Sequence, residues 1–218
     1  GAWVHVDGAF GLWAAVVPSL AGQVAGIAGA DSWATDAHKW LNVPYDSGLA
    51  IVAHPAAHRA AMSMRASYLQ RGNDEERVGM DWVPESSRRA RVVPLYALIQ
   101  ALGGDGIRDL VDRTCQLARR MAERLAGERG VRILNEVALN QVLVAFDGPG
   151  GSGPAACTPE VILRVQAEGT CWAGGATWQG QDAMRISVSN WSTTEADIDR
   201  SAAAIIGCYR AAVSAAGG

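Results

Sequence analysis

The run Gly48-Leu-Ala-Ile-Val-Ala53 contains no polar side chain, and it constrains the fold of this chain more than any other segment. Its length fits a strand, and a strand that is apolar on both faces is typical of a sheet covered by helices on both sides. Two shorter strands are predicted before it, at residues 3–7 and 30–34, with a buried helical segment at 10–17 between them. A helix is predicted at 54–66. The first part of the chain therefore predicts an α/β sheet.

The second part of the chain predicts a smaller α+β unit. A helix at 92–102 ends at Gly103-Gly104, and Asp105 caps a long amphipathic helix whose apolar residues recur every 3.6 positions. Thr194 and Asp197 form a capping box at the start of the last helix. Between these helices we expect, in chain order, strands at 131–134 and 141–146, a helix at 159–167, and strands at 170–177 and 184–188.

The change from strands with helices to this smaller unit places a domain boundary near residue 100. We predict two domains, residues 1–99 and residues 100–218.

Composition excludes several classes of protein. The chain has 19 Lys and Arg against 22 Asp and Glu, a formal net charge of −3, which argues against a nucleic-acid-binding protein. Hydrophobic residues make up 49% and charged residues 19%, which excludes a disordered chain. The longest apolar stretch, around residues 10–18, is shorter than the roughly 20 residues of a membrane helix, and no secretion signal is visible. We expect a cytoplasmic protein that binds neither nucleic acid nor membranes.

The cysteines and histidines do not predict a metal site. The four cysteines are widely spaced and form no C-x-x-C motif, so we interpret them as reduced cytosolic thiols. His54 and His58 are four residues apart, but Pro55 lies between them and no Glu completes a zinc-binding motif. The cysteines are Cys115, Cys157, Cys171 and Cys208.

Lys39 is the only lysine in the chain, so 18 of the 19 basic residues are arginines. A solitary lysine favours a chemical explanation, because a lysine amine can bond covalently to an aldehyde and an arginine cannot. A surface lysine is the alternative. Trp40 and Leu41 follow directly, and we expect them to shield the amine from water.

Asp7 ends the first predicted strand, and Lys39 follows the second. Ligands bind at the ends of strands in a doubly wound sheet, although Asp7 could instead cap the next turn. An acid at one strand end and a lysine after the next is the arrangement that pyridoxal phosphate needs, because the carboxylate keeps the pyridine nitrogen protonated while the lysine holds the cofactor. His38 could donate to the phosphate, or serve as a core or capping histidine.

Longer patterns around these residues resemble a known family. The runs Trp3-Val-His-Val-Asp7-Gly-Ala9 and Asp36-Ala-His-Lys39-Trp-Leu-Asn-Val-Pro-Tyr-Asp-Ser-Gly48 are similar to the group II pyridoxal-dependent amino acid decarboxylases, which include aromatic amino acid, glutamate and histidine decarboxylases. Ser87-Arg-Arg-Ala-Arg91 and Asn190-Trp-Ser-Thr-Thr-Glu195 also match. The resemblance covers nearly the whole chain and corresponds to the C-terminal half of the family. We therefore expect this chain, which starts with Gly1, to be part of a longer protein.

The resemblance implies the fold type I of pyridoxal-phosphate-dependent transferases, an α/β fold. The chain would form the C-terminal part of the large sheet domain and the small α+β C-terminal domain of a homodimer with sites between subunits. Asp7 would pair with the pyridine nitrogen and Ala9 would pack on the ring. Asp36 and His38 would lie near the phosphate or the lysine, and Lys39 would carry the cofactor. Lys39 and Asp7 are the predicted catalytic residues.

The reaction implied is the decarboxylation of an L-amino acid, catalysed by a lyase. Residues 70–87 are predicted to form a mobile lid, because the segment is long and polar and contains Gly72 and Gly79 as hinges. Family members often carry a Tyr in this loop, and this chain has none there. Aldehyde synthesis, transamination and carbon–carbon cleavage therefore stay open as alternatives, as does a truncated homologue without catalytic activity.

Three further features are interpreted as structural. Arg88, Arg89 and Arg91 form a basic cluster, typical of a solvated face or an interface. The glycine-rich segment 103–106 is interpreted as a helix-entry turn rather than a phosphate loop. Arg185 could meet a substrate carboxylate, but a structural ion pair in a strand is the favoured interpretation.

Overall fold

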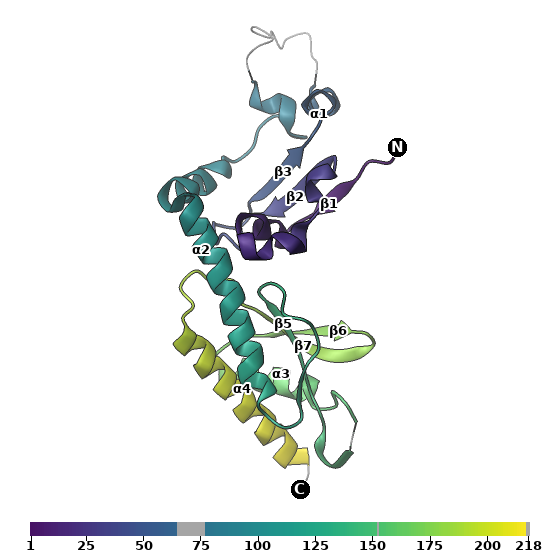
Figure 1. Cartoon of the computed structure of the whole chain (residues 1–218), viewed down its shortest axis with the longest axis vertical. Helices are drawn as coiled ribbons and strands as arrows, with labels where there is room; N and C mark the ends of the chain where they lie inside the picture. The colour runs from purple at the N-terminus through teal and green to yellow at the C-terminus, as the bar shows by residue number, and fades with distance from the viewer. Residues whose placement is uncertain (65–76, 152, 217–218) are drawn as a thin grey trace.

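The computed structural model describes residues 1–64, 77–151 and 153–216. Helix α2 (Val92–Ala126) links two groups of elements: a small sheet lies beside its first half, and a second sheet with two helices lies along its second half (Figure 1). No helix in the described ranges has the length and apolarity that crossing a membrane requires.

The first sheet places the ends of two strands at one edge. Strands β1 and β2 are parallel, with His5 opposite Ser32, and β3 runs antiparallel to β2, with Gly48 opposite Asp36. Because β1 and β2 point the same way, the residues that follow them emerge at the same edge of the sheet. The strands are β1 (His5–Asp7), β2 (Ser32–Asp36) and β3 (Gly48–Val52), in the order β1-β2-β3.

Strand β3 is less buried than its apolar sequence predicts. Gly48 and Ala50 are exposed, and Ile51 is 47% exposed. Helix α1 (Pro55–Met62), which follows β3, has no buried residue. The prediction of a strand covered on both faces is therefore wrong for the described part of the chain, where β3 is an edge strand that pairs only with β2.

The segment between β1 and β2 forms short 3-10 helices. The apolar run predicted at 10–17 becomes η1 (Gly11–Val16), and Pro18 opens η2 (Pro18–Val24); a third short helix, η3 (Ile27–Gly29), follows. Proline is favoured at a first helical position because its missing N–H needs no partner there. Side chains of η1 and η2 pack with Trp40 against helix α2, so this segment joins the residues after Lys39 to the helix.

Helix α2 is broken where the sequence predicts that one helix ends and the next begins. Gly103 leaves helical geometry, with φ 62° and ψ −174°, and a second helical segment continues after it to Ala126. Glycine adopts a positive φ at little cost, so Gly103 ends the first segment, and α2 consists of two helices joined at a kink, as predicted. The domain boundary predicted near residue 100 lies within α2, and the two-domain division stays a prediction.

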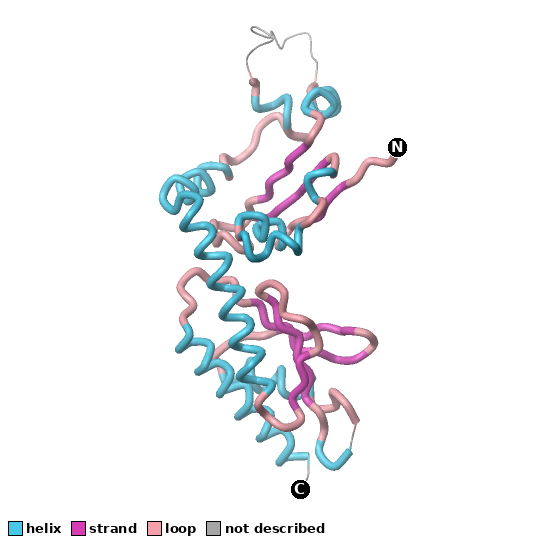
Figure 2. The backbone as a smooth tube through the Cα atoms, in the orientation of Figure 1, coloured by secondary structure: helices cyan, strands magenta, loops and turns pink. Residues whose placement is uncertain are grey.

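The second sheet is fully antiparallel and forms the largest core. Helices α2, α3 and α4 pack on it, as Figure 2 shows, and bury Phe146, Met184 and Ile205 among other apolar side chains. The predicted strand at 141–146 is confirmed. The elements are β4 (Val131–Ile133), β5 (Gln141–Phe146), the short helix η5 (Pro149–Gly151), α3 (Thr158–Glu168), β6 (Gly174–Trp178), β7 (Gln181–Ser187) and α4 (Glu195–Ala216), with the strand order β4-β5-β7-β6.

The capping box predicted at the start of α4 is confirmed. The backbone N–H of Asp197 donates to Thr194 Oγ1 at 3.3 Å, and the backbone N–H of Thr194 donates to Asp197 Oδ2 at 2.9 Å. These reciprocal bonds satisfy backbone donors that the first turn of a helix leaves without intrahelical partners.

Candidate functional site

Asp7 and Asp36 end the two parallel strands of the first sheet. The backbone N–H of Gly8 donates to the carbonyl of Ala34 at 2.9 Å, and the N–H of Asp36 donates to the carbonyl of Ala9 at 3.1 Å. These bonds continue the β1–β2 pairing past the last strand residues. The turn that carries Ala9 is thereby held beside the segment that leads to Lys39.

Gly8 is required by this close approach. A Cβ atom at this position would lie 2.6 Å from Leu12 Cβ and 3.1 Å from the carbonyl oxygen of Ala34. Contacts that short force a shift of backbone, so a larger residue would push the two strand ends apart. The glycine after Asp7 therefore helps to set the spacing of the site.

The Asp7 carboxylate is exposed and has one hydrogen bond. Its Oδ1 accepts the backbone N–H of Ala9 at 3.1 Å, which orients the side chain over the turn. Among the described residues no Arg, Lys or His lies within ion-pair distance of Asp7. The carboxylate is thus available to a cation that approaches the strand edge.

Lys39 lies in the turn after β2, next to a carboxylate. Its Nζ is 2.8 Å from Asp36 Oδ2, and its side chain is 40% exposed. The prediction that Trp40 and Leu41 shield the amine is wrong: both are fully buried, and the indole N–H of Trp40 donates to Thr114 Oγ1 at 2.8 Å in the core. The two apolar residues anchor the turn, and the amine remains accessible to solvent.

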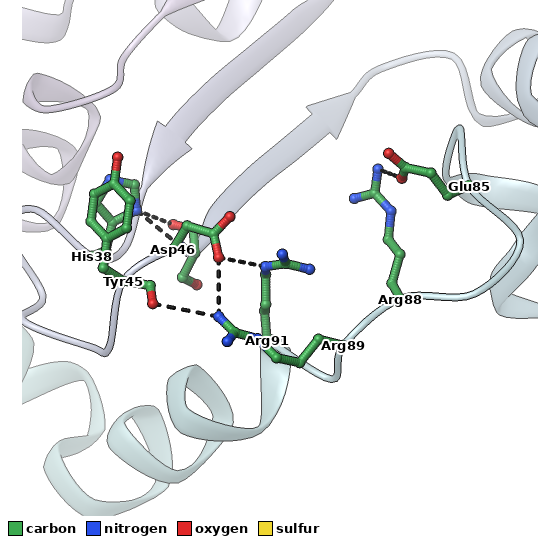
Figure 3. A network of polar contacts seen from close by, with 8 residues as sticks. His38, Tyr45, Asp46, Glu85, Arg88, Arg89 and Arg91 are labelled. Atoms are coloured by element: carbon green, nitrogen blue, oxygen red, sulfur yellow. Dashed lines mark hydrogen bonds and ion pairs between the residues drawn. The ribbon is translucent and has the colours of Figure 1, made fainter.

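His38 is held against the loop that follows it. Its Nδ1 lies 3.0 Å from the backbone nitrogen of Ser47, and its ring packs on Tyr45 with 4.3 Å between centroids (Figure 3). Nδ1 also lies 3.1 Å from the Ser47 carbonyl oxygen, so Nδ1 accepts the Ser47 N–H or donates to that carbonyl according to the tautomer of the ring. The other ring nitrogen, Nε2, lies 3.9 Å from Asp36 Oδ2. The lysine and the histidine therefore face the same carboxylate.

The arginine cluster binds the loop that carries Tyr45. Arg91 Nε and Arg89 Nη2 lie 2.7 and 3.1 Å from Asp46 Oδ1, and Arg89 Nη2 also donates to the carbonyl of Tyr45 at 3.4 Å (Figure 3). The hydrogen bond from Arg91 lowers the pKa of Asp46, and the same bond raises the pKa of Arg91. Arg88 pairs instead with Glu85. The cluster that the sequence assigned to a solvated face or an interface braces the site loop.

Part of the predicted lid lies outside the described residues, because the structure describes residues 77–87 but not 65–76. The described part contains the short helix η4 (Gly79–Trp82). Trp82 packs edge-on against His58, with 5.5 Å between centroids, and Arg77 lies 4.5 Å above the Trp82 ring. This end of the predicted lid is packed against α1.

The remaining candidates are not brought to this edge. Arg185 is exposed on β7 and makes no ion pair within the described ranges, so the predicted structural ion pair is not formed. His54 Nε2 lies 3.0 Å from Asp31 Oδ1 and His58 packs on Trp82. The described residues contain no cluster of three or more potential metal ligands. All four cysteines are free, and burial raises the pKa of Cys115 to about 11.

Three residues that build the site were not predicted from the sequence. Tyr45 packs on His38, Asp46 receives two arginines, and Asn42 bonds to a distant loop. All three lie within the run from His38 to Gly48, so the signal was present. The sequence could not show which side chains of that run face Lys39 and which bind other segments.

Comparisons with known sequences point to one family. A family profile described as the pyridoxal-dependent decarboxylase conserved domain matches residues 1–147. Histidine decarboxylase of Mus musculus is 27% identical over 202 residues, which cover 92% of this chain and 30% of the relative. The 4-hydroxyphenylacetaldehyde synthase of Rhodiola rosea is 25% identical over 199 residues, which cover 90% of this chain and 40% of the relative.

Comparison with solved structures shows the fold. The chain matches the Oryza sativa TDC structure with PLP and tryptamine with a TM-score of 0.88 and 19% identity, covering 97% of this chain and 45% of that one. This likeness shows the α/β architecture of fold type I. The chain spans less than half the length of these relatives.

Proposed function

Because the chain belongs to the pyridoxal-dependent decarboxylase family, we propose that it supplies the cofactor-binding lysine and acid of an enzyme that decarboxylates an L-amino acid. Pyridoxal phosphate is the cofactor of this family. One observation carries the proposal: Asp7 and the Asp36–Lys39 turn follow adjacent parallel strands and are joined by the bond between the Asp36 N–H and the Ala9 carbonyl, 3.1 Å long.

The residues at the strand edge fit pyridoxal phosphate. Asp7 presents a carboxylate without a cationic partner among the described side chains, and a protonated pyridine nitrogen is such a partner. Lys39 presents a primary amine on a side chain that is 40% exposed, so a planar aldehyde can reach it. At Gly8 a Cβ would lie 2.6 Å from Leu12 Cβ, so the absence of a side chain lets the backbone turn tightly at that edge.

When bound, the cofactor supplies an electron sink that weakens the bonds to the substrate Cα. We assign Asp7 to the pyridine nitrogen, where its negative charge favours the protonated ring. Ala9 would contact the ring face, because its N–H binds Asp7 Oδ1 at 3.1 Å and its side chain is too small to displace the ring.

Lys39 supplies the nucleophilic amine, and Asp36 holds that amine in an ion pair. The 2.8 Å ion pair also orients the amine, and it keeps the Lys39 side chain near the edge of the sheet. His38 Nε2 lies 3.9 Å from the same carboxylate, which is too long for a hydrogen bond, and it can donate to a phosphate oxygen when the proton is on Nε2. A second donor at this place offsets the repulsion between the Asp36 carboxylate and a phosphate group.

To test the proposal, the full-length protein is loaded with cofactor and reduced with borohydride, and the modified peptide is identified by mass spectrometry. We expect a pyridoxyl mass on the peptide that contains Lys39. A label found only on another lysine of the full-length protein would contradict the assignment. Lys39→Arg keeps the charge next to Asp36 and is expected to abolish the label, which makes it the matched control.

Product analysis then identifies the reaction. Formation of carbon dioxide and the corresponding amine from an L-amino acid supports decarboxylation, whereas an aldehyde product supports the alternative that the similarity to an aldehyde synthase favours. A protein that never acquires the visible absorbance of bound cofactor would be a homologue without this chemistry. The homodimer and the cytoplasmic location stay predictions, and so do the substrate and the mobile lid.

A further inference from the structure

The loop after Lys39 is bonded to a distant segment of the chain. Residues 189–193, here called the strap, connect β7 to α4. Asn42 Nδ2 donates to the carbonyl of Ser189 at 2.7 Å, and the N–H of Trp191 donates to Asn42 Oδ1 at 3.3 Å. Asn42 Nδ2 also donates to the carbonyl of Trp40 at 2.7 Å. One side-chain amide therefore joins the lysine loop to the strap through both of its ends.

Helix α2 also forms hydrogen bonds with the strap. Arg113 Nη1 donates to the carbonyl of Thr193 at 2.9 Å, and Nη2 donates to the carbonyl of Trp191 at 2.7 Å. Thr114, the next residue of α2, accepts the indole N–H of Trp40 at 2.8 Å. One turn of α2 thus contacts both the strap and the lysine loop, and Asn42 closes the connection between them.

The geometry of Asn42 is suited to this role. Its backbone has a φ of 55°, a left-handed conformation that Asn and Asp tolerate better than other non-glycine residues. The amide uses both N–H groups and its oxygen in backbone bonds, so its capacity is almost fully used. Asn42 follows Lys39 by three positions, and the fully buried Trp40 and Leu41 lie between them.

The segment before Lys39 is held by backbone bonds. The N–H of Asp36 donates to the Ala9 carbonyl at 3.1 Å, and the N–H of Ala37 donates to the Ser47 carbonyl at 2.8 Å. The N–H of Lys39 itself reaches the Asp36 carbonyl at 3.4 Å, which is long for a hydrogen bond. The segment after Lys39 is held where Trp40 enters the core and Asn42 bonds to the strap.

We propose that Asn42 is a positioning residue: its amide ties the lysine loop to the strap and holds Lys39 at the place from which it bonds the cofactor. The proposal rests on the proposed function of Lys39. It makes the strap, which precedes α4, part of the structure that sets cofactor affinity.

The first test is Asn42→Asp in the full-length protein. Asp has nearly the same shape and tolerates the same backbone conformation, but its carboxylate cannot donate and would face the carbonyls of Trp40 and Ser189. We expect the dissociation constant of pyridoxal phosphate, measured by absorbance titration, to rise about tenfold, because two hydrogen bonds are lost and one repulsion is gained. Borohydride labelling of Lys39 at subsaturating cofactor should fall in parallel.

Asn135→Asp is the matched control. Asn135 also uses its whole amide on backbone groups: Nδ2 donates to the carbonyls of Glu136 and Gln141 at 2.9 and 3.1 Å, and Oδ1 accepts the N–H of Leu143 at 2.7 Å. This variant should lower the midpoint of unfolding but leave cofactor affinity within about twofold of the parent, because these bonds lie within the second sheet. An equal loss of affinity in both variants would overturn the proposal, since it would show a general effect of stability.

Asn42→Gly is the second variant. Glycine accepts the positive φ without strain, so this change removes the amide alone and covers the case in which Asn42→Asp does not fold. The same rise in dissociation constant is expected. Affinity within about twofold of the parent in Asn42→Gly would overturn the proposal. If instead Lys39 of the parent protein is never labelled, the proposed function fails, and that result is distinguishable because it does not depend on residue 42.

Discussion

Lys39 and Asp36 form an ion pair three residues apart, with 2.8 Å between Nζ and Oδ2, at the end of strand β2. The same carboxylate oxygen lies 3.9 Å from His38 Nε2. The amine of the only lysine in the chain is therefore held by a carboxylate that also faces His38.

Asp36→Asn should make Lys39 react faster with an amine-specific reagent in the cofactor-free protein. Removal of the carboxylate releases the amine from the 2.8 Å ion pair that holds it. Partly exposed ion pairs of this kind correspond to changes of roughly twofold to fivefold. The rate is measured by mass spectrometry on the peptide that contains Lys39. Asp105→Asn, at an exposed site on α2, is the control and should leave the rate unchanged. A slower reaction in Asp36→Asn would contradict the prediction.

Asp7→Asn should reduce kcat in the full-length enzyme by about a hundredfold or more while Lys39 still binds the cofactor. The Asn side chain has the same shape and can still accept the Ala9 N–H, but it carries no negative charge. The protonated ring therefore loses its counter-ion in the transition state. Steady-state kinetics and the absorbance of bound cofactor are measured together. A kcat within about threefold of the parent would show that Asp7 is not the partner of the pyridine nitrogen.

Gly8→Ala should weaken cofactor binding and lower stability by roughly 1–3 kcal/mol, because the new methyl group would overlap Leu12 Cβ, 2.6 Å from the ideal Cβ position. Thermal unfolding and absorbance titration test the two effects. Gly22→Ala is the matched control, since a Cβ there meets no atom within 4 Å. Equal stability of the two variants would contradict the predicted close contact at Gly8.

Asp199→Asn should make the protein's stability less dependent on pH in acid. The hydrogen bond from Arg120 and the bond from Arg124 lower the pKa of Asp199 from 3.8 to about 2 in the folded chain. Because the folded pKa lies below the unfolded one, the carboxylate stabilises the fold above about pH 3.8 and loses that effect as the pH falls toward 2. Chemical unfolding at several pH values measures the slope.

The parent protein should lose stability more steeply than Asp199→Asn between pH 4 and pH 2. Asp182→Asn, an exposed strand residue without an ion pair in the described ranges, is the control and should follow the parent. Identical slopes in the parent and in Asp199→Asn would show that the arginines do not act on Asp199 in solution.

The sequence alone predicted several of the elements and the residues to which the chemistry is assigned. The apolar run that ends at Phe146 predicted the strand at 141–146, and the Thr194–Asp197 spacing predicted the cap of α4, because both depend on neighbours in the chain. Lys39 stood out because no other residue of the chain carries a lysine amine. The run from His38 to Gly48 indicated the family because its residues are consecutive in the chain and can be compared directly.

Only the tertiary structure decided what surrounds that lysine. Local sequence predicted that Trp40 would shield the amine, but its indole bonds to Thr114, 74 residues away, and the lysine amine remains exposed. The bonds from Asn42 to the strap span up to 149 residues. Such contacts depend on how α2 and the second sheet pack, and hydrogen bonds between distant segments leave no periodic pattern in a sequence.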